Sequence, residues 1–265
     1  MPIITKISTQ KNATDRYNIF LDEKFAFGVD EEVLMRFQLG KGKELSELEI
    51  TQIQYEDEIR KAFNTAINFL SFRMRSESEI RTHLKKKEWE EPVIQAVLLK
   101  LNERQYIDDL EFASAYVRTQ VNGGKKGPGT IKQELKQKGV ADHYIEEALT
   151  KYDGEQQIEH AIQLGNKLTK QNSSLSERSL KQKIQQHLMT KGFPSNIISI
   201  AMEEIEFEKE DDAEWEALLV QGEKAHRRYK SLSGYEYKQK MKQVLFRKGF
   251  AIEIIDRFLQ EKDKE

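Results

Sequence analysis

A short residue pattern that occurs four times constrains the fold of this chain more than any other feature. Each copy has a leucine, then a lysine three positions on, a glycine in three of the four copies, and an aromatic or apolar residue. Two more apolar residues follow five and nine positions later. The leucines are Leu84, Leu135, Leu188 and Leu245, which lie 51, 53 and 57 residues apart. A period near fifty residues predicts a stacked array of helical repeats.

The repeated pattern has the residue order of a helix end. A glycine at C′ enters the left-handed backbone region at little cost, and in a Schellman cap the C3 and C″ residues touch. With Gly139 at C′, Leu135 takes C3 and Val140 takes C″. Gly192 and Gly249 stand at the same position in their copies, so the spacing predicts three glycine caps. The first copy has Glu88 there, as expected of an atypical terminal repeat.

Apolar residues at helical spacing lie on both sides of each repeated pattern, and a third amphipathic stretch precedes it. Helix-start signals agree with this reading. Asp108 or Asp109 can cap the helix that carries Phe112, and Pro128 suits a first helical turn. The sequence therefore predicts four modules of three helices each, over residues 56–107, 108–153, 154–209 and 210–265.

The first 55 residues follow a different period. Residues typical of strands alternate in period two through Ile3, Thr5 and Ile7 and again from Tyr17 to Leu21, and the run from Asp22 to Lys24 suits a hairpin turn. A short helical pattern follows Gly28, and Ser46 with Glu49 forms a capping-box sequence. Residues 1–55 are therefore predicted to form a small antiparallel sheet with a helix.

Composition indicates a soluble protein of the reducing cytoplasm. Of the 265 residues, 38% are hydrophobic and 33% charged, which leaves enough apolar side chains for a core if neighbouring modules stack. There is no cysteine, so disulfides are excluded. The residues after Met1 lack the basic start and apolar run of a signal peptide, and no apolar stretch approaches membrane-spanning length.

Basic residues gather on the predicted middle helices and the loops beside them, although the formal net charge is only −2. If stacked modules present these helices on one side, the residues form a basic stripe suited to a polyanion or an acidic protein groove. The alternative is that the lysines only solvate helix faces. The residues of the stripe are Lys125, Lys126, Lys132, Lys136, Lys181, Lys183, Arg227, Arg228, Lys238, Lys240 and Lys242.

No catalytic constellation is recognisable. The five histidines include no pair at metal-ligand spacing on a helix, and no cysteine is present to complete a zinc site. The glycine-rich run from Gly123 to Thr130 lacks the glycine-lysine-serine/threonine ending of a phosphate loop and reads as a linker between helices. We therefore predict a protein that is not an enzyme, with no cofactor, no metal and no small-molecule substrate.

The centre of the chain carries a more specific set of residues. They are Tyr106 to Asp109, Phe112, Ala113, Tyr116, Val117, Lys126 to Pro128, Ile131, Glu134, Leu135 and Lys138 to Val140. Together with the repeated pattern, this set closely resembles the central signature of the RecX family of recombination regulators. The resemblance covers residues 56 to 263, and the strand-rich start is similar to the extension of longer, Gram-positive-type members.

This resemblance implies a mainly α-helical protein in which tandem three-helix modules form a curved, elongated, right-handed array behind a small antiparallel sheet. It implies that the partner is the RecA recombinase filament on single-stranded DNA. RecX proteins lodge in the filament groove and restrain filament extension, strand exchange, ATP hydrolysis and co-protease activity in the SOS response. Some members bind DNA directly, so single-stranded and double-stranded DNA are further candidate partners. A monomer is expected.

Two alternatives from other functional classes stay open. The chain could be a free-standing DNA-binding protein, because three-helix units resemble helix-turn-helix proteins. However, the turn before the third helix of the second module is followed by Asp142, Glu146 and Glu147, which are poor partners for base edges. The second alternative is a helical-repeat scaffold that binds an unrelated protein.

Overall fold

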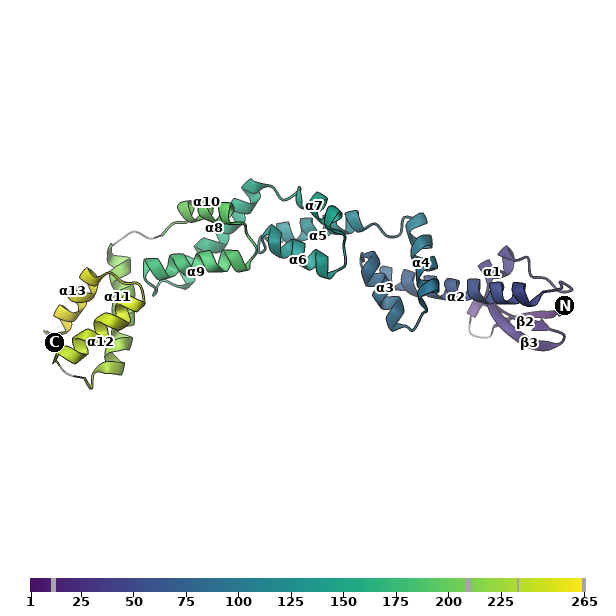
Figure 1. Cartoon of the computed structure of the whole chain (residues 1–265), viewed down its shortest axis with the longest axis horizontal. Helices are drawn as coiled ribbons and strands as arrows, with labels where there is room; N and C mark the ends of the chain where they lie inside the picture. Colours follow the sequence, from purple (N-terminus) through teal and green to yellow (C-terminus); the bar gives the residue numbers. More distant parts are fainter. Residues whose placement is uncertain (11–12, 208–210, 233, 264–265) are drawn as a thin grey trace. The chain divides into compact units, whose positions relative to one another are not determined.

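The computed structural model describes residues 1–10, 13–207, 211–232 and 234–263, in two compact units (Figure 1). One unit comprises Met1–Ala113 with Lys136–Tyr144, and the other Ser114–Leu135 with Ile145–Glu265. The chain begins with a three-stranded antiparallel sheet, β1 (Ile4–Gln10), β2 (Ala13–Leu21) and β3 (Lys24–Asp30), in the order β1-β2-β3. The tight turn between β2 and β3 places Asp22 and Glu23 at φ 47° and 70°. Helix α1 (Glu31–Arg36) follows.

Helix α2 (Glu47–Leu70) belongs both to the N-terminal sheet region and to the first three-helix module. It starts at Ser46 with the capping box that the sequence predicts, in which Ser46 and Glu49 satisfy each other's backbone N–H groups. Ile53 packs in the core under the sheet, whereas Ile59 and Phe63 pack in the core of the module. The predicted boundary between residues 55 and 56 therefore falls inside one continuous helix.

Three helices recur in each of the four modules that the repeat predicts. The first module joins the C-terminal half of α2 to α3 (Glu77–Lys86) and α4 (Glu91–Glu103). The later helices are α5 (Asp109–Gly123), α6 (Pro128–Gln137), α7 (Asp142–Leu149), α8 (Gly154–Gln171), α9 (Glu177–Thr190), α10 (Ser195–Glu204), α11 (Asp211–Tyr229), α12 (Gly234–Arg247) and α13 (Ile252–Lys262). A mainly helical chain of tandem three-helix modules behind a small antiparallel sheet is confirmed. The predicted boundary between residues 209 and 210 lies outside the described residues.

The middle helix of every module ends where the repeated pattern predicts. Gly139, Gly192 and Gly249 have φ of +75°, +83° and +89°, in the left-handed region. In the third module the Phe193 N–H donates to the Leu188 carbonyl at 3.1 Å, which is the outer bond of a Schellman cap. The first module closes in the same way around Glu88, which has φ 63°.

Each of the three glycine caps also joins its module to the preceding one, and the joint between the first and second modules uses side chains. The Ser76 hydroxyl, at the start of α3, donates to the Lys138 carbonyl at 2.6 Å. The Glu77 N–H donates to the Asp109 carboxylate at 2.9 Å. Burial and the nearby carboxylates raise the pKa of Asp109, although its bond to this N–H opposes the rise.

The joint between the third and fourth modules repeats this arrangement with other residues. The Ser176 and Ser179 hydroxyls, at the start of α9, both donate to the Lys248 carbonyl, at 2.5 and 2.7 Å. The Glu177 N–H donates to the Glu214 carboxylate at 2.9 Å. Helix starts leave backbone N–H groups without partners, so a carboxylate from the next module completes the cap.

Backbone groups make the joint between the second and third modules. The Gly127 N–H donates to the Lys191 carbonyl at 2.7 Å, and the Gly129 N–H donates to the Gly192 carbonyl at 2.9 Å. The approach is so close that a Cβ on Gly127 would lie 2.4 Å from the Phe193 nitrogen. The glycine-rich run from Gly123 to Thr130 therefore serves packing between modules, which agrees with its reading as a linker.

The joints explain why the cap residue is glycine in three modules and glutamate in one. A Cβ on Gly139 would lie 2.2 Å from the Ser78 hydroxyl, and one on Gly192 would lie 2.3 Å from the Thr130 nitrogen. Glu88 ends the middle helix of the first module, and its side chain is exposed to solvent. The position therefore needs glycine chiefly where another module packs against the cap.

Candidate nucleic-acid interface

The lysines predicted to form the basic stripe in the second module lie in ion pairs. Lys136 contacts Asp142 at 2.8 Å, and Lys132 pairs with Glu146, so both cations on α6 reach carboxylates at α7. On the loop before α6, Lys126 contacts Glu134 at 2.5 Å. Exposed pairs of this kind contribute about 0 to 1 kcal/mol. A phosphate could replace the carboxylate at modest cost, but these charges are already compensated.

The stripe residues of the third module also have contact partners within the protein. Lys181 pairs with Glu177 on the preceding turn of α9, and its ammonium lies 4.8 Å from the centre of the Phe207 ring. Lys183 donates to the Asn172 side-chain oxygen at 2.5 Å. On α9, therefore, the predicted stripe consists of cations that hold local contacts.

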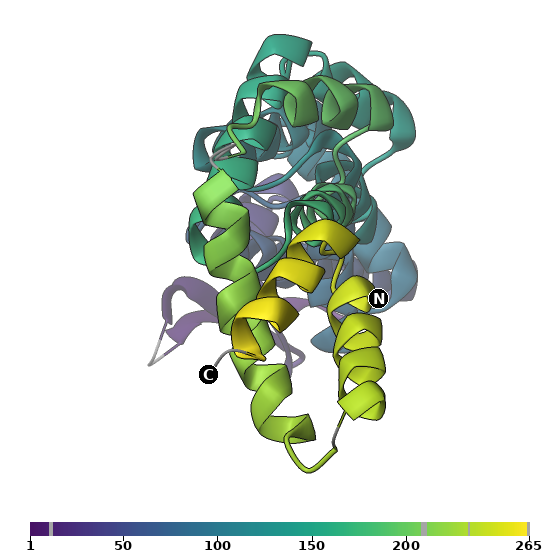
Figure 2. The ribbon, with the colours of Figure 1, turned by 90° about the vertical axis from the view of Figure 1, so that its left-hand side faces the viewer.

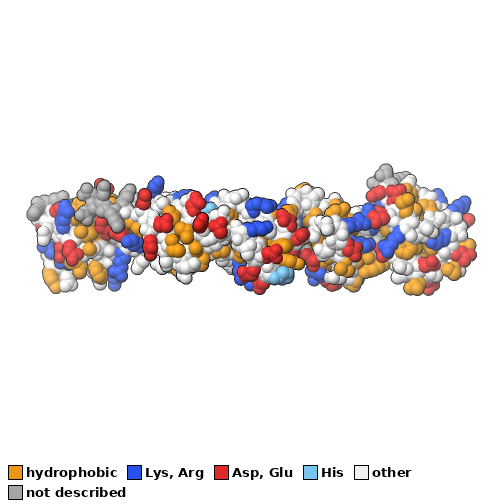
Figure 3. Space-filling view, turned by 90° about the horizontal axis from the view of Figure 1, so that it is seen from above, with side chains coloured by type: hydrophobic (Ala, Val, Ile, Leu, Met, Phe, Trp, Pro, Cys, Tyr) orange, Lys and Arg blue, Asp and Glu red, His pale blue; other side chains and the backbone are white. Residues whose placement is uncertain are grey.

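In the fourth module two of the stripe lysines are paired and one is not. Lys238 contacts Asp263 at 2.5 Å and Lys242 contacts Asp256 at 2.6 Å. Lys240 has no ion-pair partner within the described part of the chain, and its ammonium lies 6.0 Å from the centre of the Tyr229 ring. The face drawn in Figure 3 shows Lys and Arg side chains interspersed with Asp and Glu side chains.

The last turns of α11 hold two of the predicted cations outside any ion pair, although the Glu223 carboxylate one turn earlier interacts with Arg227. Arg227 and Arg228 are exposed and form no ion pair with any residue that the structure describes. The Arg228 guanidinium lies 5.7 Å from the centre of the Tyr229 ring. Figure 2 shows α11, α12 and α13 in the foreground. Lys224 and Lys230 add two exposed cations to the same end of α11. Lys125, on the loop before α6, is likewise exposed and unpaired among the described residues.

A second basic and aromatic group, at the corner between α2 and α3, was not predicted from the sequence. The Phe69 and His83 rings stack with centroids 3.9 Å apart and planes 3° apart, and the Arg75 guanidinium lies 4.0 Å from the Phe69 centroid. Phe72, in the turn between the helices, is 83% exposed. The signal in the sequence was the alternation of apolar and basic residues from Phe72 to Arg75, directly after a predicted helix.

Positive charge surrounds His83. Burial, together with Lys87, Arg75 and Lys86, lowers the pKa of His83 below its usual value. His187 stands at the equivalent place in the third module, and its pKa is lowered by burial and by Lys191 and Lys183. The stack on Phe69 indicates a structural role for His83.

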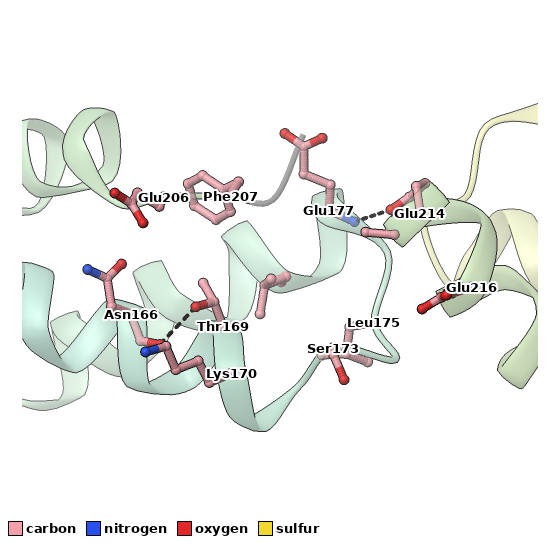
Figure 4. Close-up of a pocket in the computed structure, with 12 residues that line it drawn as sticks. Asn166, Thr169, Lys170, Ser173, Leu175, Glu177, Glu206, Phe207, Glu214 and Glu216 are labelled. Carbon is pink, nitrogen blue, oxygen red and sulfur yellow. Dashed lines mark hydrogen bonds between the residues drawn. The ribbon is translucent and has the colours of Figure 1, made fainter. Parts of the chain in front are cut away.

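A hollow lined by residues of the third and fourth modules is acidic. It has a volume of about 410 Å³, and Glu177, Glu206, Glu214 and Glu216 line it together with Lys170 (Figure 4). Burial and the neighbouring Glu177 raise the pKa of Glu214. Four carboxylates against one lysine would repel phosphate, so this hollow does not suit a nucleic-acid backbone.

The structure shows no centre for metal chemistry within the described residues. Histidine, aspartate and glutamate side chains nowhere gather in threes that could hold a metal ion there. Among the same residues, none of the helices has the length and apolar character needed to cross a membrane. The site is therefore best described by its cations and aromatic rings.

Comparison with known proteins matches almost the whole chain. Family models of the regulatory protein RecX match residues 2–46 (N-terminal domain), 62–101 (first three-helix domain), 108–149 (second), and 155–202 and 212–259 (third, matched twice). Proteins described as regulatory protein RecX from Bacillus velezensis and Bacillus subtilis are 51% and 50% identical, over 99% of this chain and 100% of their own length.

Solved structures of regulatory proteins RecX are also similar to this chain. A crystal structure of a regulatory protein RecX aligns with a TM-score of 0.70 at 42% identity, and the alignment covers 77% of this chain and all of the other. A second one, from Lactobacillus salivarius, aligns with a TM-score of 0.55 at 37% identity, over 57% of this chain and 97% of the other.

Proposed function

Because this chain belongs to the RecX family of regulatory proteins, we propose that it binds the RecA filament on single-stranded DNA and restrains it. The observation that carries the proposal is the full-length match, in which the N-terminal domain and all four three-helix modules correspond to RecX models. In this proposal the modules lie in the filament groove and limit filament extension, strand exchange, RecA-driven ATP hydrolysis and co-protease activity. The protein acts in the cytoplasm, as a monomer and without catalysis of its own.

The test is RecA-driven ATP hydrolysis on single-stranded DNA at increasing concentrations of the purified protein. We expect the rate to fall and the protein to co-sediment with RecA–DNA filaments more strongly than with DNA alone. Binding to DNA with no effect on RecA would favour the free-standing DNA-binding alternative. Capture of another protein from nuclease-treated extract, with no effect on RecA, would favour the scaffold alternative.

Arg227 and Arg228 of α11, which form no ion pair among the described residues, should contribute more to DNA binding than the ion-paired lysines of α6. Each lost phosphate contact lowers the log–log salt slope of single-strand binding by about 0.7. Replacing Arg227 and Arg228 by alanine should therefore reduce the slope by about 1.4 if each contacts a phosphate. Replacing Lys132 and Lys136 by glutamine should reduce it less, since Glu146 and Asp142 already hold these charges.

The two double variants are matched controls for each other, because both remove two exposed or half-exposed cations from a helix. Their circular dichroism should equal that of the parent protein. Equal salt slopes for both variants would mean that ion pairing does not decide which cations meet the phosphates. Unchanged slopes for both would show that these residues are solvated faces and that the DNA contacts lie elsewhere.

A further inference from the structure

We propose that the corner between α2 and α3 in the first module is a stacking site for bases of single-stranded DNA. This inference rests on the proposed function and adds a contact that the basic stripe does not contain. The site consists of the exposed ring of Phe72, the stacked pair Phe69 and His83, and the cations Arg75, Lys86 and Lys87.

The first argument is exposure. Phe72 is 83% exposed, the largest value for any large hydrophobic side chain in the described part of the chain, and Met74 beside it is 47% exposed. When another flat apolar surface covers an aromatic ring that was exposed to water, the free energy falls. Bases of a single strand offer such faces whatever their sequence.

The second argument is the charge around these rings. Arg75, Lys86 and Lys87 form no ion pair among the described residues, although the Glu79 carboxylate raises the pKa of Arg75 from nearby, and all three lie close enough to His83 to lower its pKa. Cations without partners next to aromatic rings match the two needs of a single strand, whose phosphates require positive charge and whose bases require stacking. An apolar protein segment would use the rings but would leave these charges without partners.

The third argument is the shape of the site. A hollow of about 360 Å³ adjoins the corner, and Phe69, His83, Lys86 and Lys138 are among its lining residues. The single carboxylate among its lining residues, Glu79, is already compensated by Arg73 at 2.9 Å and by Lys138 at 3.3 Å. The hollow therefore has an aromatic wall without a strong negative charge, in contrast to the acidic hollow lined by Glu177 and Glu214.

The test compares two oligonucleotides of equal length, oligo(dT) and its abasic deoxyribose-phosphate counterpart, by fluorescence anisotropy. Phe72→Ala should weaken oligo(dT) binding about five-fold or more and leave abasic binding unchanged, since only the base contact is lost. Lys86→Gln should weaken both and reduce the salt slope by about 0.7. Leu48→Ala is the matched control, because Leu48 is 78% exposed but lies between Glu47 and Glu49.

A direct readout does not depend on affinity. Oligo(dT) with one 5-iodouracil, irradiated in the complex, should crosslink to residues 69–83 of the full-length protein, and Phe72→Ala should abolish that crosslink. If Phe72→Ala binds both oligonucleotides like the parent and the crosslink persists or maps elsewhere, the stacking site is wrong. If the variant binds DNA normally but no longer restrains RecA, the corner contacts protein, which also overturns the inference and leaves the proposed function standing.

Discussion

Gly192→Val should destabilise the protein by about 2 to 5 kcal/mol. Gly192 has φ +83°, and a left-handed backbone costs a residue with a Cβ about 1 to 2 kcal/mol. The Cβ would also lie 2.3 Å from the backbone nitrogen of Thr130, so the second and third modules must separate locally, and overpacking of this kind costs about 1 to 3 kcal/mol. Chemical denaturation, followed by circular dichroism, measures the loss.

Substitutions at the other three caps serve as controls, because each is expected to change stability by a different amount. At Gly249 the nearest atom to a new Cβ is the Ser176 hydroxyl, which can rotate, so the same substitution should cost less than at Gly192. At Gly139 a new Cβ would also lie 2.3 Å from the Ser78 Cβ, which cannot rotate away, so the cost there should approach that at Gly192. Glu88→Gly should be neutral or stabilising, because Glu88 already has φ 63° and an exposed side chain. Equal losses at all four positions would contradict both the strain argument and the role of the joints.

Local rules explain what the sequence predicts well. A helix cap depends on residues within one turn, so the position of Gly192 relative to Leu188 and Phe193 is sufficient to place the helix end. The two-residue turn at Asp22 and the capping box at Ser46 are equally local. The repeat then extends each local prediction to the other modules.

The joints and ion pairs could not be predicted because they connect residues far apart in the sequence. Ser76 meets the Lys138 carbonyl across 62 positions, and nothing in the sequence around Ser76 identifies that partner. Whether a helix lysine is free for phosphate also depends on the next helix. Lys136 and Arg228 look alike in sequence, but only Lys136 faces a carboxylate in the described structure.

A contact between distant residues also explains why helix α2 continues across the predicted boundary at residue 55. Sequence periodicity alone gives no reason to bury any residue of the charged run from Glu56 to Glu58. The structure buries Asp57 instead, because Arg16 on β2 reaches it from the sheet with two bonds, at 2.8 and 3.2 Å. Burial of a charged residue can be predicted only when its partner is known, and the sequence does not show that Arg16 is the partner of Asp57.

Asp57→Ala should cost about 3 to 5 kcal/mol of the free energy of unfolding, the usual result of removing one member of a buried ion pair. Asp57 is 2% exposed, and besides Arg16 it accepts the backbone N–H of Asp30 at 2.8 Å and the Lys61 ammonium at 2.8 Å. Alanine leaves a largely buried guanidinium and a buried N–H without this partner. Asp57→Asn keeps an acceptor for that N–H and should cost less, whereas Glu261→Ala, in an exposed pair with Arg257, should change stability by less than about 0.5 kcal/mol.

The same network predicts how this loss depends on pH. Burial alone would raise the pKa of Asp57, but the bonds from Arg16, Lys61 and the Asp30 N–H outweigh it and lower the pKa from 3.8. A carboxylate with a lowered folded-state pKa stabilises the fold above its unfolded pKa and loses that contribution as pH falls through the folded value. The difference in unfolding free energy between the parent and Asp57→Ala should therefore be constant from pH 7 to about 5 and shrink below pH 3.8. A difference that stays constant at lower pH would mean that Asp57 acts through packing, and that the charge pair does not hold the sheet against α2.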